Sequence, residues 1–134
     1  MFVATNPTTG HILHEYAMMD SGALESAIDQ SAKTYAIWRK EPFEARAAIL
    51  TQVAQLLRQQ EERLARLMTD EMGKPIKEAR GEVQKSAWCA EHYAQYGAEY
   101  LAPKSLPSDA SHSYVQHLPL GAVLGVLPWN APFW

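Results

Sequence analysis

The chain lacks the residues and segments on which several classes of protein depend. It has one cysteine among 134 residues, which excludes an internal disulfide framework and is typical of the reducing cytoplasm, where we expect this protein. No apolar run approaches the roughly 18 residues that a membrane-spanning helix needs. Acidic residues outnumber basic ones and the formal net charge is −3, so we expect neither nucleic acid nor a membrane as a partner. Residues 1–6 also lack the basic start and apolar core of a secretory signal peptide.

What the chain does contain is typical of an ordinary globular protein. Apolar residues make up 47% of the chain and charged residues 20%, and the length suits a single domain. Near the N-terminus, the segments 2–5 and 12–16 flank the sequence Asn6-Pro7-Thr8-Thr9-Gly10. Because Asn-Pro opens turns and glycine tolerates positive φ, the two segments are predicted to pair as a β-hairpin.

Four helices are predicted after this hairpin. Asp20 or Ser21 can cap the first helix, and Pro42 suits the first turn of the second. The sequence Gly73-Lys74-Pro75 predicts the end of the third helix and the start of the fourth. Apolar residues recur in steps of three and four, as expected of helices with one buried face. These positions are Leu24, Ile28, Tyr35 and Trp38; Ala47, Leu50, Val53, Ala54 and Leu57; Leu64, Leu67, Met68 and Met72; and Ile76, Ala79, Val83, Ala87, Ala90, Ala94 and Gly97.

The remaining residues predict strands rather than another helix. Residues 103–111 form a polar linker, and residues 113–118 are predicted to be a strand. The apolar run 122–127 lies between a glycine and a proline, which is typical of a strand buried on both faces. The order of elements therefore predicts an α/β fold. A hairpin and four helices (1–111) precede a short strand (112–120) and a first central strand with the turn that follows it (121–134).

Most polar residues that could suggest a catalytic or metal site have a simpler interpretation. Cys89 lies mid-helix, away from a helix N-terminus that would favour its thiolate, so we do not expect it to be a nucleophile. His11 and His14 are three residues apart on a strand and face opposite sides, so no metal site is expected. Glu61-Glu62 is expected on a solvated helix face with minor ion pairs. Lys74 is expected to interact with the dipole at a helix C-terminus.

Several stretches of the chain, taken together, resemble the N-terminal part of the aldehyde dehydrogenase superfamily. They occur in the family's order and at approximately its spacing, over the whole length of the chain. The stretches are Asn6-Pro7-Thr8-Thr9-Gly10, Trp38-Arg39, Glu71-Met72-Gly73-Lys74-Pro75, Ala79-Arg80-Gly81-Glu82-Val83, Pro119-Leu120-Gly121 and Pro128-Trp129-Asn130. The Glu-Met-Gly-Lys-Pro form and the ending Pro-Phe-Trp resemble the bacterial succinate-semialdehyde dehydrogenase branch in particular. The resemblance implies an aldehyde-dehydrogenase-like Rossmann domain, of which this chain holds the hairpin, the helices and the first strands.

The resemblance also implies a reaction and a role for two residues. In this family a cysteine thiolate adds to an aldehyde, hydride passes to NAD or NADP, and a glutamate helps water to release the carboxylic acid. Carried over to this sequence, the Asn130 amide is the oxyanion donor, and Trp129 and Asn130 contact the cofactor. Ala131 stands where the family usually has Phe, which removes a ring behind Asn130. The strand at 113–118 would belong to an arm through which the subunits form a homo-oligomer.

The resemblance covers roughly the first quarter to third of a family member. Because the family's catalytic Cys and Glu lie downstream, we expect this chain alone to be inactive, to bind no dinucleotide and no metal, and to self-associate through its unpaired apolar segment. A non-catalytic interaction module that pairs with a full-length subunit is the alternative function. An expressed remnant without function is a third interpretation.

Overall fold

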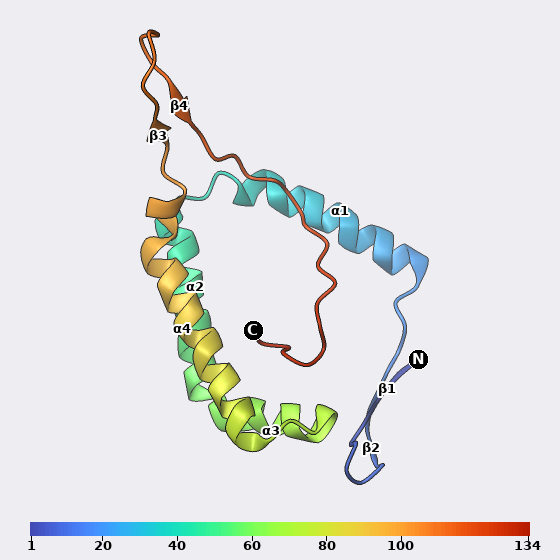
Figure 1. Ribbon diagram of the computed structural model, residues 1–134. Coiled ribbons are helices and arrows are strands. Elements are labelled where there is room, and N and C mark those ends of the chain that lie inside the picture. The colour runs from blue at the N-terminus through green and yellow to red at the C-terminus, as the bar shows by residue number, and fades with distance from the viewer.

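Two short β-hairpins stand before and after a series of four helices (Figure 1). The computed structural model describes all residues, 1–134. The elements are β1 (Phe2–Thr5), β2 (Ile12–Tyr16), α1 (Ser21–Trp38), α2 (Phe43–Gln59), α3 (Glu61–Met72), α4 (Ile76–Tyr100), β3 (Lys104–Ser105) and β4 (Tyr114–Val115). The predicted order of hairpin, four helices and strand is therefore confirmed. None of the four helices combines the length and apolar character needed to cross a membrane.

The N-terminal hairpin forms as its sequence predicts. Strands β1 and β2 pair antiparallel, with Phe2 opposite Tyr16 and Val3 opposite Glu15. In the connecting loop, the Asn6 side-chain oxygen accepts hydrogen bonds from the backbone N–H groups of Thr8 (2.9 Å) and Thr9 (3.1 Å). This is the Asx-turn geometry by which asparagine initiates turns. Gly10 then adopts a φ of 73°, which lets the chain reverse without strain.

The helices begin and end at the residues that the sequence marks. The Asp20 carboxylate accepts a hydrogen bond from the Ala23 N–H (2.7 Å) and so caps α1. Pro42 precedes α2, where its missing N–H costs no helical hydrogen bond. At the end of α3, Gly73 adopts a left-handed φ of 75°, and Pro75 directly precedes α4.

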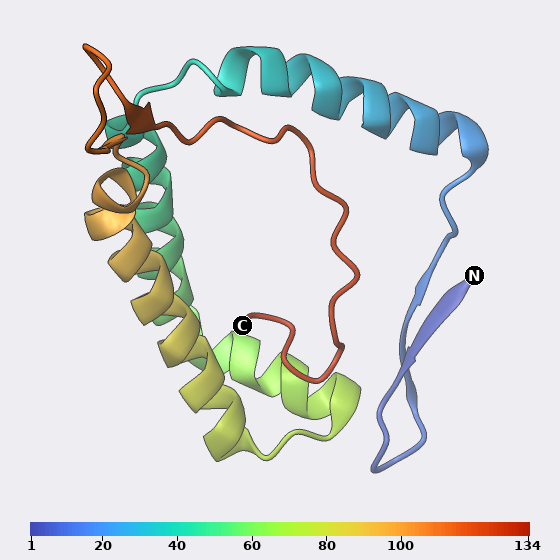
Figure 2. The same ribbon diagram turned by 45° about the horizontal axis from the view of Figure 1, so that its top comes forward.

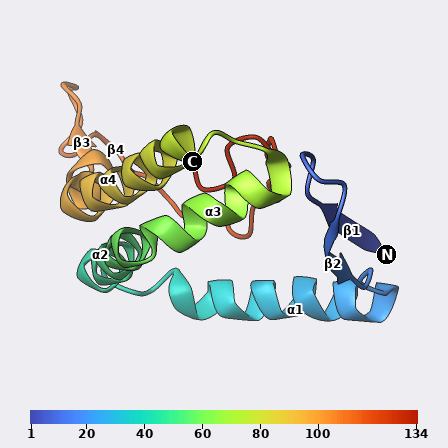
Figure 3. The same ribbon diagram turned by 90° about the horizontal axis from the view of Figure 1, so that it is seen from below.

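The core lies where α3 meets α4, and α2 packs along the remainder of α4 (Figures 1 and 3). Its buried residues are Leu64, Ala65, Met68, Ala79 and Val83. The small side chains predicted on one face of α4 do face this packing, and Ala79, Val83 and Ala87 are completely buried. Five of the predicted core positions are wrong, because their residues are 39–60% exposed: Leu24, Ile28, Trp38, Val53 and Leu67. The first three lie on α1, in which no residue is buried, and Leu67 lies beside the C-terminal residues 129–133 without being buried by them.

Helix α1 extends away from the other three helices and is fixed at its C-terminal end. The Arg46 guanidinium donates to the carbonyl oxygens of Trp38 (3.1 Å) and Arg39 (3.3 Å), which are among the carbonyls that the end of a helix leaves without an intrahelical partner. The same guanidinium lies over the rings of Trp38 and Phe43. No residue of α1 is buried, so its apolar positions have no partner along most of the helix.

The segment after α4 corrects two predictions. Residues 103–111 are not merely a linker, because Lys104–Ser105 forms β3 and pairs antiparallel with β4. The strand predicted over 113–118 is limited to Tyr114–Val115. A hydrogen bond from the Leu106 N–H to the Ser113 carbonyl (2.8 Å) continues the pairing beyond β3. Only residues 104–106 and 113–115 take part in this pairing, so β4 ends where no backbone groups of the β3 segment remain opposite it.

The central strand predicted over 122–127 does not form. The segment is an irregular coil that runs from α1 to α3 across the frame of helices (Figure 2). Leu124 is 90% exposed and Val126 is 91% exposed. The sequence interpretation assumed a neighbouring strand on each side, and none lies beside this segment. Its backbone groups therefore have no ladder to join, and the apolar side chains stay in solvent.

Candidate functional site

The last turn of the chain lies against α3 and α4 at the core. Phe133 packs against the buried cluster formed by Leu64, Ala65, Met68, Ala79 and Val83. Beside this ring, Leu67, Met68, Glu71, Met72, Trp129, Pro132 and Phe133 line a small hollow of about 230 Å³. At the end of the turn, the Lys85 ammonium lies 3.6 Å from the centre of the Trp134 ring. The turn is thus held by packing at Phe133 and by a cation–π contact at Trp134.

The Glu82 carboxylate is the polar centre of this contact. One of its oxygens accepts the backbone N–H groups of Phe133 (2.9 Å) and Trp134 (3.3 Å), and the other pairs with the Lys74 ammonium. The Glu82 side chain is only 6% exposed. Burial raises the pKa of this carboxyl, but Lys74 and the two backbone N–H donors outweigh burial, so the pKa is below its ordinary value. Glu82 is therefore a buried, ionised anchor for the backbone of the turn.

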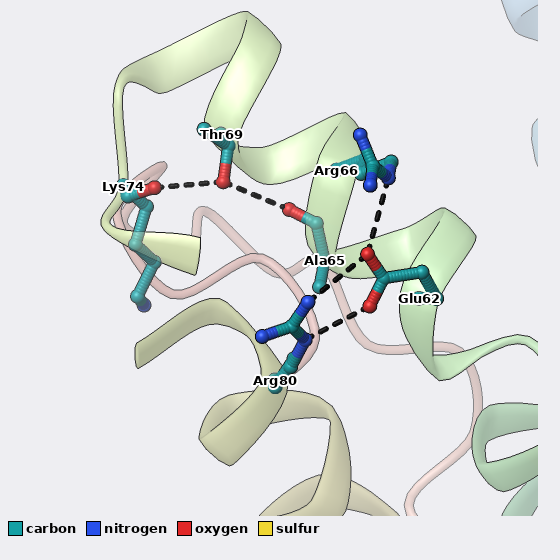
Figure 4. Close-up of polar contacts among 6 residues, drawn as sticks. All are labelled: Glu62, Ala65, Arg66, Thr69, Lys74 and Arg80. Atoms are coloured by element: carbon teal, nitrogen blue, oxygen red, sulfur yellow. Dashed lines mark hydrogen bonds and ion pairs between the residues drawn. The ribbon is translucent and has the colours of Figure 1, made fainter. Parts of the chain in front are cut away.

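Lys74 contacts the same turn from the short connection between α3 and α4. Its ammonium donates to the carbonyl oxygen of Asn130 (3.0 Å) as well as to Glu82. The hydroxyl of Thr69, in the last turn of α3, lies 2.8 Å from the Lys74 carbonyl and 3.1 Å from the Ala65 carbonyl (Figure 4). Gly73 in its left-handed conformation reverses the chain just before Lys74. These contacts fix the backbone from which the Lys74 side chain extends.

Trp129 and Asn130 lie in the anchored turn with their side chains toward solvent. The backbone carbonyl of Asn130 is bonded to Lys74, but its side-chain amide makes no hydrogen bond within the chain. Trp129 is 74% exposed, although it contributes to the rim of the hollow. Ala131 is half-buried, and Phe133 supplies the ring that packs behind the turn. An anchored backbone that carries a free amide can present a hydrogen-bond donor in a fixed place.

Comparison with known proteins decides the family. The sequence model described as the aldehyde dehydrogenase family matches residues 1–134, which is the whole chain. The chain belongs to the aldehyde dehydrogenase family. The resemblance noted from the sequence motifs is therefore confirmed.

Semialdehyde dehydrogenases are among its similar relatives. A succinate-semialdehyde dehydrogenase [NADP(+)] of Deinococcus radiodurans is 35% identical over 99% of this chain and 28% of its own length. A probable succinate-semialdehyde dehydrogenase [NADP(+)] of Synechocystis is 38% identical over 100% of this chain and 30% of its own length. The chain thus spans less than a third of the length of these relatives.

A solved structure agrees with the fold. The succinic semialdehyde dehydrogenase of Streptococcus pyogenes, in complex with NADP⁺, is 35% identical and superposes with a TM-score of 0.81. The match covers 85% of this chain and 25% of that one. The predicted α/β class, with a hairpin and helices that form part of an aldehyde dehydrogenase domain, is confirmed.

The other polar residues singled out in the sequence do not gather at this turn. Cys89 lies half-buried in the middle of α4, as predicted. His11 lies just before β2 and His14 within it, and the chain holds no group of three or more His, Cys, Asp or Glu residues suited to a metal ion. Glu62, predicted on a solvated face, is exposed but bridges α3 to α4, because its carboxylate pairs with both Arg66 and Arg80 (Figure 4).

Sequence reasoning missed the two residues that anchor the turn. Lys74 was expected to interact with a helix dipole, whereas its ammonium bonds Glu82 and Asn130 instead. Glu82 belongs to the family-like stretch Ala79-Arg80-Gly81-Glu82-Val83, which by itself assigns it no role. A signal was present, since Glu82 follows Ala79 by three residues and precedes Ser86 by four, on the buried face of α4. A charged residue on a face of small apolar side chains needs a buried partner.

Proposed function

We propose that this chain supplies the N-terminal part of a cytoplasmic NAD- or NADP-dependent dehydrogenase that oxidises a semialdehyde, with succinic semialdehyde as the substrate. The family match supports the reaction class, and the semialdehyde dehydrogenase relatives support the substrate. One structural observation carries the proposal. The backbone of the Trp129–Trp134 turn is bonded to Glu82 and Lys74, while the Asn130 amide stays exposed and unbonded.

In this proposal the Asn130 amide is the donor for the aldehyde oxygen. When a nucleophile adds to the carbonyl carbon, that oxygen gains negative charge, and a donor already held in place stabilises the charge without reorganisation. One such donor is worth about 3–4 kcal/mol of the activation barrier. Within this chain the only thiol is Cys89, in the middle of α4. The chain alone is therefore expected to show no aldehyde oxidation above that of its Cys89→Ala variant.

Trp129 and Asn130 are the residues of this chain that would contact a dinucleotide. The exposed Trp129 indole offers a surface for stacking, and the Asn130 amide offers a hydrogen bond. Together they could contact one side of such a cofactor. A bound nicotinamide would accept the hydride in the oxidation. The hollow beside the turn measures about 230 Å³, below the roughly 300–1,000 Å³ of typical ligand sites. We therefore expect calorimetry on the isolated chain to show a Kd for NAD and NADP no tighter than about 1 mM.

A chimaera tests the proposal directly. This chain replaces the matching N-terminal segment of the Deinococcus radiodurans relative, and turnover of succinic semialdehyde is measured with NAD and NADP. We expect turnover, and we expect Asn130→Asp to lower kcat by about 10²–10³-fold because it replaces the donor by a carboxylate. Gln52→Glu, at an exposed amide on α2 outside the turn and outside the predicted oligomer arm, is the matched control and should leave kcat unchanged. An inactive chimaera that binds NADP, or an unaffected Asn130→Asp variant, contradicts the proposal.

A non-catalytic interaction module that pairs with a full-length subunit is the second candidate function. The exposed apolar run at 122–127 favours it, because such a segment offers unpaired backbone groups to another chain. In that case the isolated chain binds the full-length Deinococcus radiodurans relative in a pull-down. The Leu124→Ser/Val126→Ser variant then weakens binding, and Asn130→Asp does not.

A further inference from the structure

One ion pair of this chain differs from all the others in its burial. The pairs Arg58–Glu91, Arg66–Glu62 and Arg80–Glu62 have side chains that are 43–71% exposed. In contrast, the Glu82 side chain is 6% exposed and that of Lys74 is 16% exposed. Exposed pairs contribute little, whereas a buried pair must recover a large desolvation cost through further hydrogen bonds. The groups that form those further hydrogen bonds therefore indicate the role of the Lys74–Glu82 pair.

All the further bonds of the pair go to the backbone of the last turn. Glu82 accepts from the N–H groups of Phe133 (2.9 Å) and Trp134 (3.3 Å), and Lys74 donates to the Asn130 carbonyl (3.0 Å). No other polar side chain holds these backbone groups. Lys74, in the connection before α4, therefore holds the start of the 130–134 segment, and Glu82, within α4, holds its end.

These bonds restrict where the backbone of Asn130 lies. The Asn130 carbonyl is held at one end of the segment, and the Phe133 N–H is held at the other. Between them lies Pro132, whose ring fixes φ near −65°. The held carbonyl fixes the peptide plane that contains the Asn130 Cα, and so it fixes the place from which the Asn130 side chain extends. A buried apolar pair of the same volume could pack as well, but it could not form hydrogen bonds with the Asn130 carbonyl and the N–H groups of Phe133 and Trp134.

We propose that Lys74 and Glu82 are positioning residues that hold the 130–134 backbone and thereby aim the Asn130 amide. This inference rests on the proposed function for the role of that amide, but the holding of the backbone stands on its own. Neither residue would touch the substrate. Loss of either should free the turn while α3 and α4 keep their packing.

Hydrogen–deuterium exchange on the full chain, read by mass spectrometry, tests the holding of the turn. Glu82→Gln and Lys74→Met should each speed exchange of the Phe133 and Trp134 amides by about 10–100-fold, since each loses a charge-assisted contact. Peptides from α3 and α4 should keep their exchange rates. The matched control is Glu62→Gln, which loses a carboxylate that bridges α3 and α4 but does not touch the turn. Unchanged exchange at 133–134, or faster exchange spread equally over α4, would overturn the proposal.

Kinetics of the chimaera test the consequence for Asn130. Glu82→Gln and Lys74→Met should lower kcat about tenfold or more with KM unchanged, as expected when only a transition-state contact is misplaced. Lys74→Arg, which keeps the cation, should restore most of kcat. An unchanged kcat in both variants overturns the positioning role. If the unsubstituted chimaera binds NADP but is inactive, the proposed function fails by itself, and the exchange rates at 133–134 still decide whether Lys74 and Glu82 hold the turn.

Discussion

Three glutamates of this chain show how burial decides what a carboxylate does. Glu62 and Glu91 lie on exposed helix faces, and hydrogen bonds from Arg80 and Arg58, respectively, lower their pKa values. For Glu82, burial raises the pKa, and contacts with Lys74 and the backbone N–H groups of Phe133 and Trp134 more than reverse that effect. The exposed pairs join helices that already pack together. The buried one connects a helix to a turn that has few other contacts.

The buried carboxylate predicts how stability depends on pH. Its pKa in the folded chain lies below the ordinary value of 4.5, so its contribution is fully present above about pH 4.5. That contribution is lost as the pH falls through the lower, folded-state pKa. Glu82→Gln should therefore reduce the free energy of unfolding by about 1–3 kcal/mol at pH 7, and by progressively less toward pH 3. Urea unfolding followed by circular dichroism over this range measures the difference.

The control for this pH series is Glu91→Gln. Its pair with Arg58 is exposed, so the substitution should change the stability much less at every pH. A Glu82→Gln difference that stays constant from pH 7 to pH 3 would show that the carboxylate does not act through its charge.

Two glycines predict opposite effects of the same substitution. Gly73 has a φ of 75°, and a Cβ there would lie 3.1 Å from the Pro7 side chain. Gly73→Ala should therefore destabilise the chain by about 1–2 kcal/mol. Gly81 lies within α4 with open space around it, so Gly81→Ala should stabilise the chain by up to about 1 kcal/mol. Thermal unfolding of both variants provides the test, and a Tm for Gly73→Ala equal to that of the unsubstituted chain contradicts the prediction.

At the scale of elements, the sequence predicts the structure well where neighbouring residues determine it, and poorly where residues distant in sequence do. The helix limits follow from Asp20, Pro42, Gly73 and Pro75, because caps and breakers act on their immediate neighbours. The run at 122–127 carries an equally clear strand pattern but forms no strand. A strand is completed by residues far away in sequence, and its own composition cannot supply them.

The same distinction applies to the candidate site. Asn130 was singled out because it belongs to a contiguous motif, Pro128-Trp129-Asn130. Glu82 and Lys74 were not assigned to the site, because their contacts with Asn130 and Phe133 bridge about fifty residues of sequence. The spacing of Glu82 on the buried face of α4 indicates that its carboxylate needs a partner, but it does not indicate which residues supply one. Only the return of the chain to α4 brings these groups together.

The α3–α4 contact predicts a large difference between adjacent residues. Met68 is 2% exposed within the core cluster, whereas Leu67 is 43% exposed at the hollow beside the last turn. Met68→Ala should cost about 2–5 kcal/mol of stability, because it leaves a cavity beneath Phe133. Leu67→Ala should cost clearly less, because its side chain is already partly in solvent. Urea unfolding monitored by helical circular dichroism measures both, and equal losses would contradict the observed orientation of α3.

At the scale of the whole molecule, the chain forms an open frame that its last segment crosses (Figure 2). That segment is held at both ends. At one end the Tyr35 hydroxyl donates to the Pro119 carbonyl (3.0 Å), and at the other Glu82 holds Phe133. Between these attachments, residues 122–127 make no backbone hydrogen bond. The two attachments fix where the segment runs and leave its apolar side chains in solvent.

This exposed segment predicts that the isolated chain associates with itself. Leu124 and Val126 are 90% and 91% exposed, and contiguous apolar side chains with unpaired backbone groups are a template for pairing between chains. Light scattering after size-exclusion chromatography should show species larger than 15.0 kDa whose share rises with concentration. Leu124→Ser with Val126→Ser should raise the monomer fraction and leave helical circular dichroism unchanged. Ile37→Ser with Leu56→Ser, which alters two separate exposed residues, is the control and should have little effect. If the unsubstituted chain remains monomeric at high concentration, this segment does not drive association.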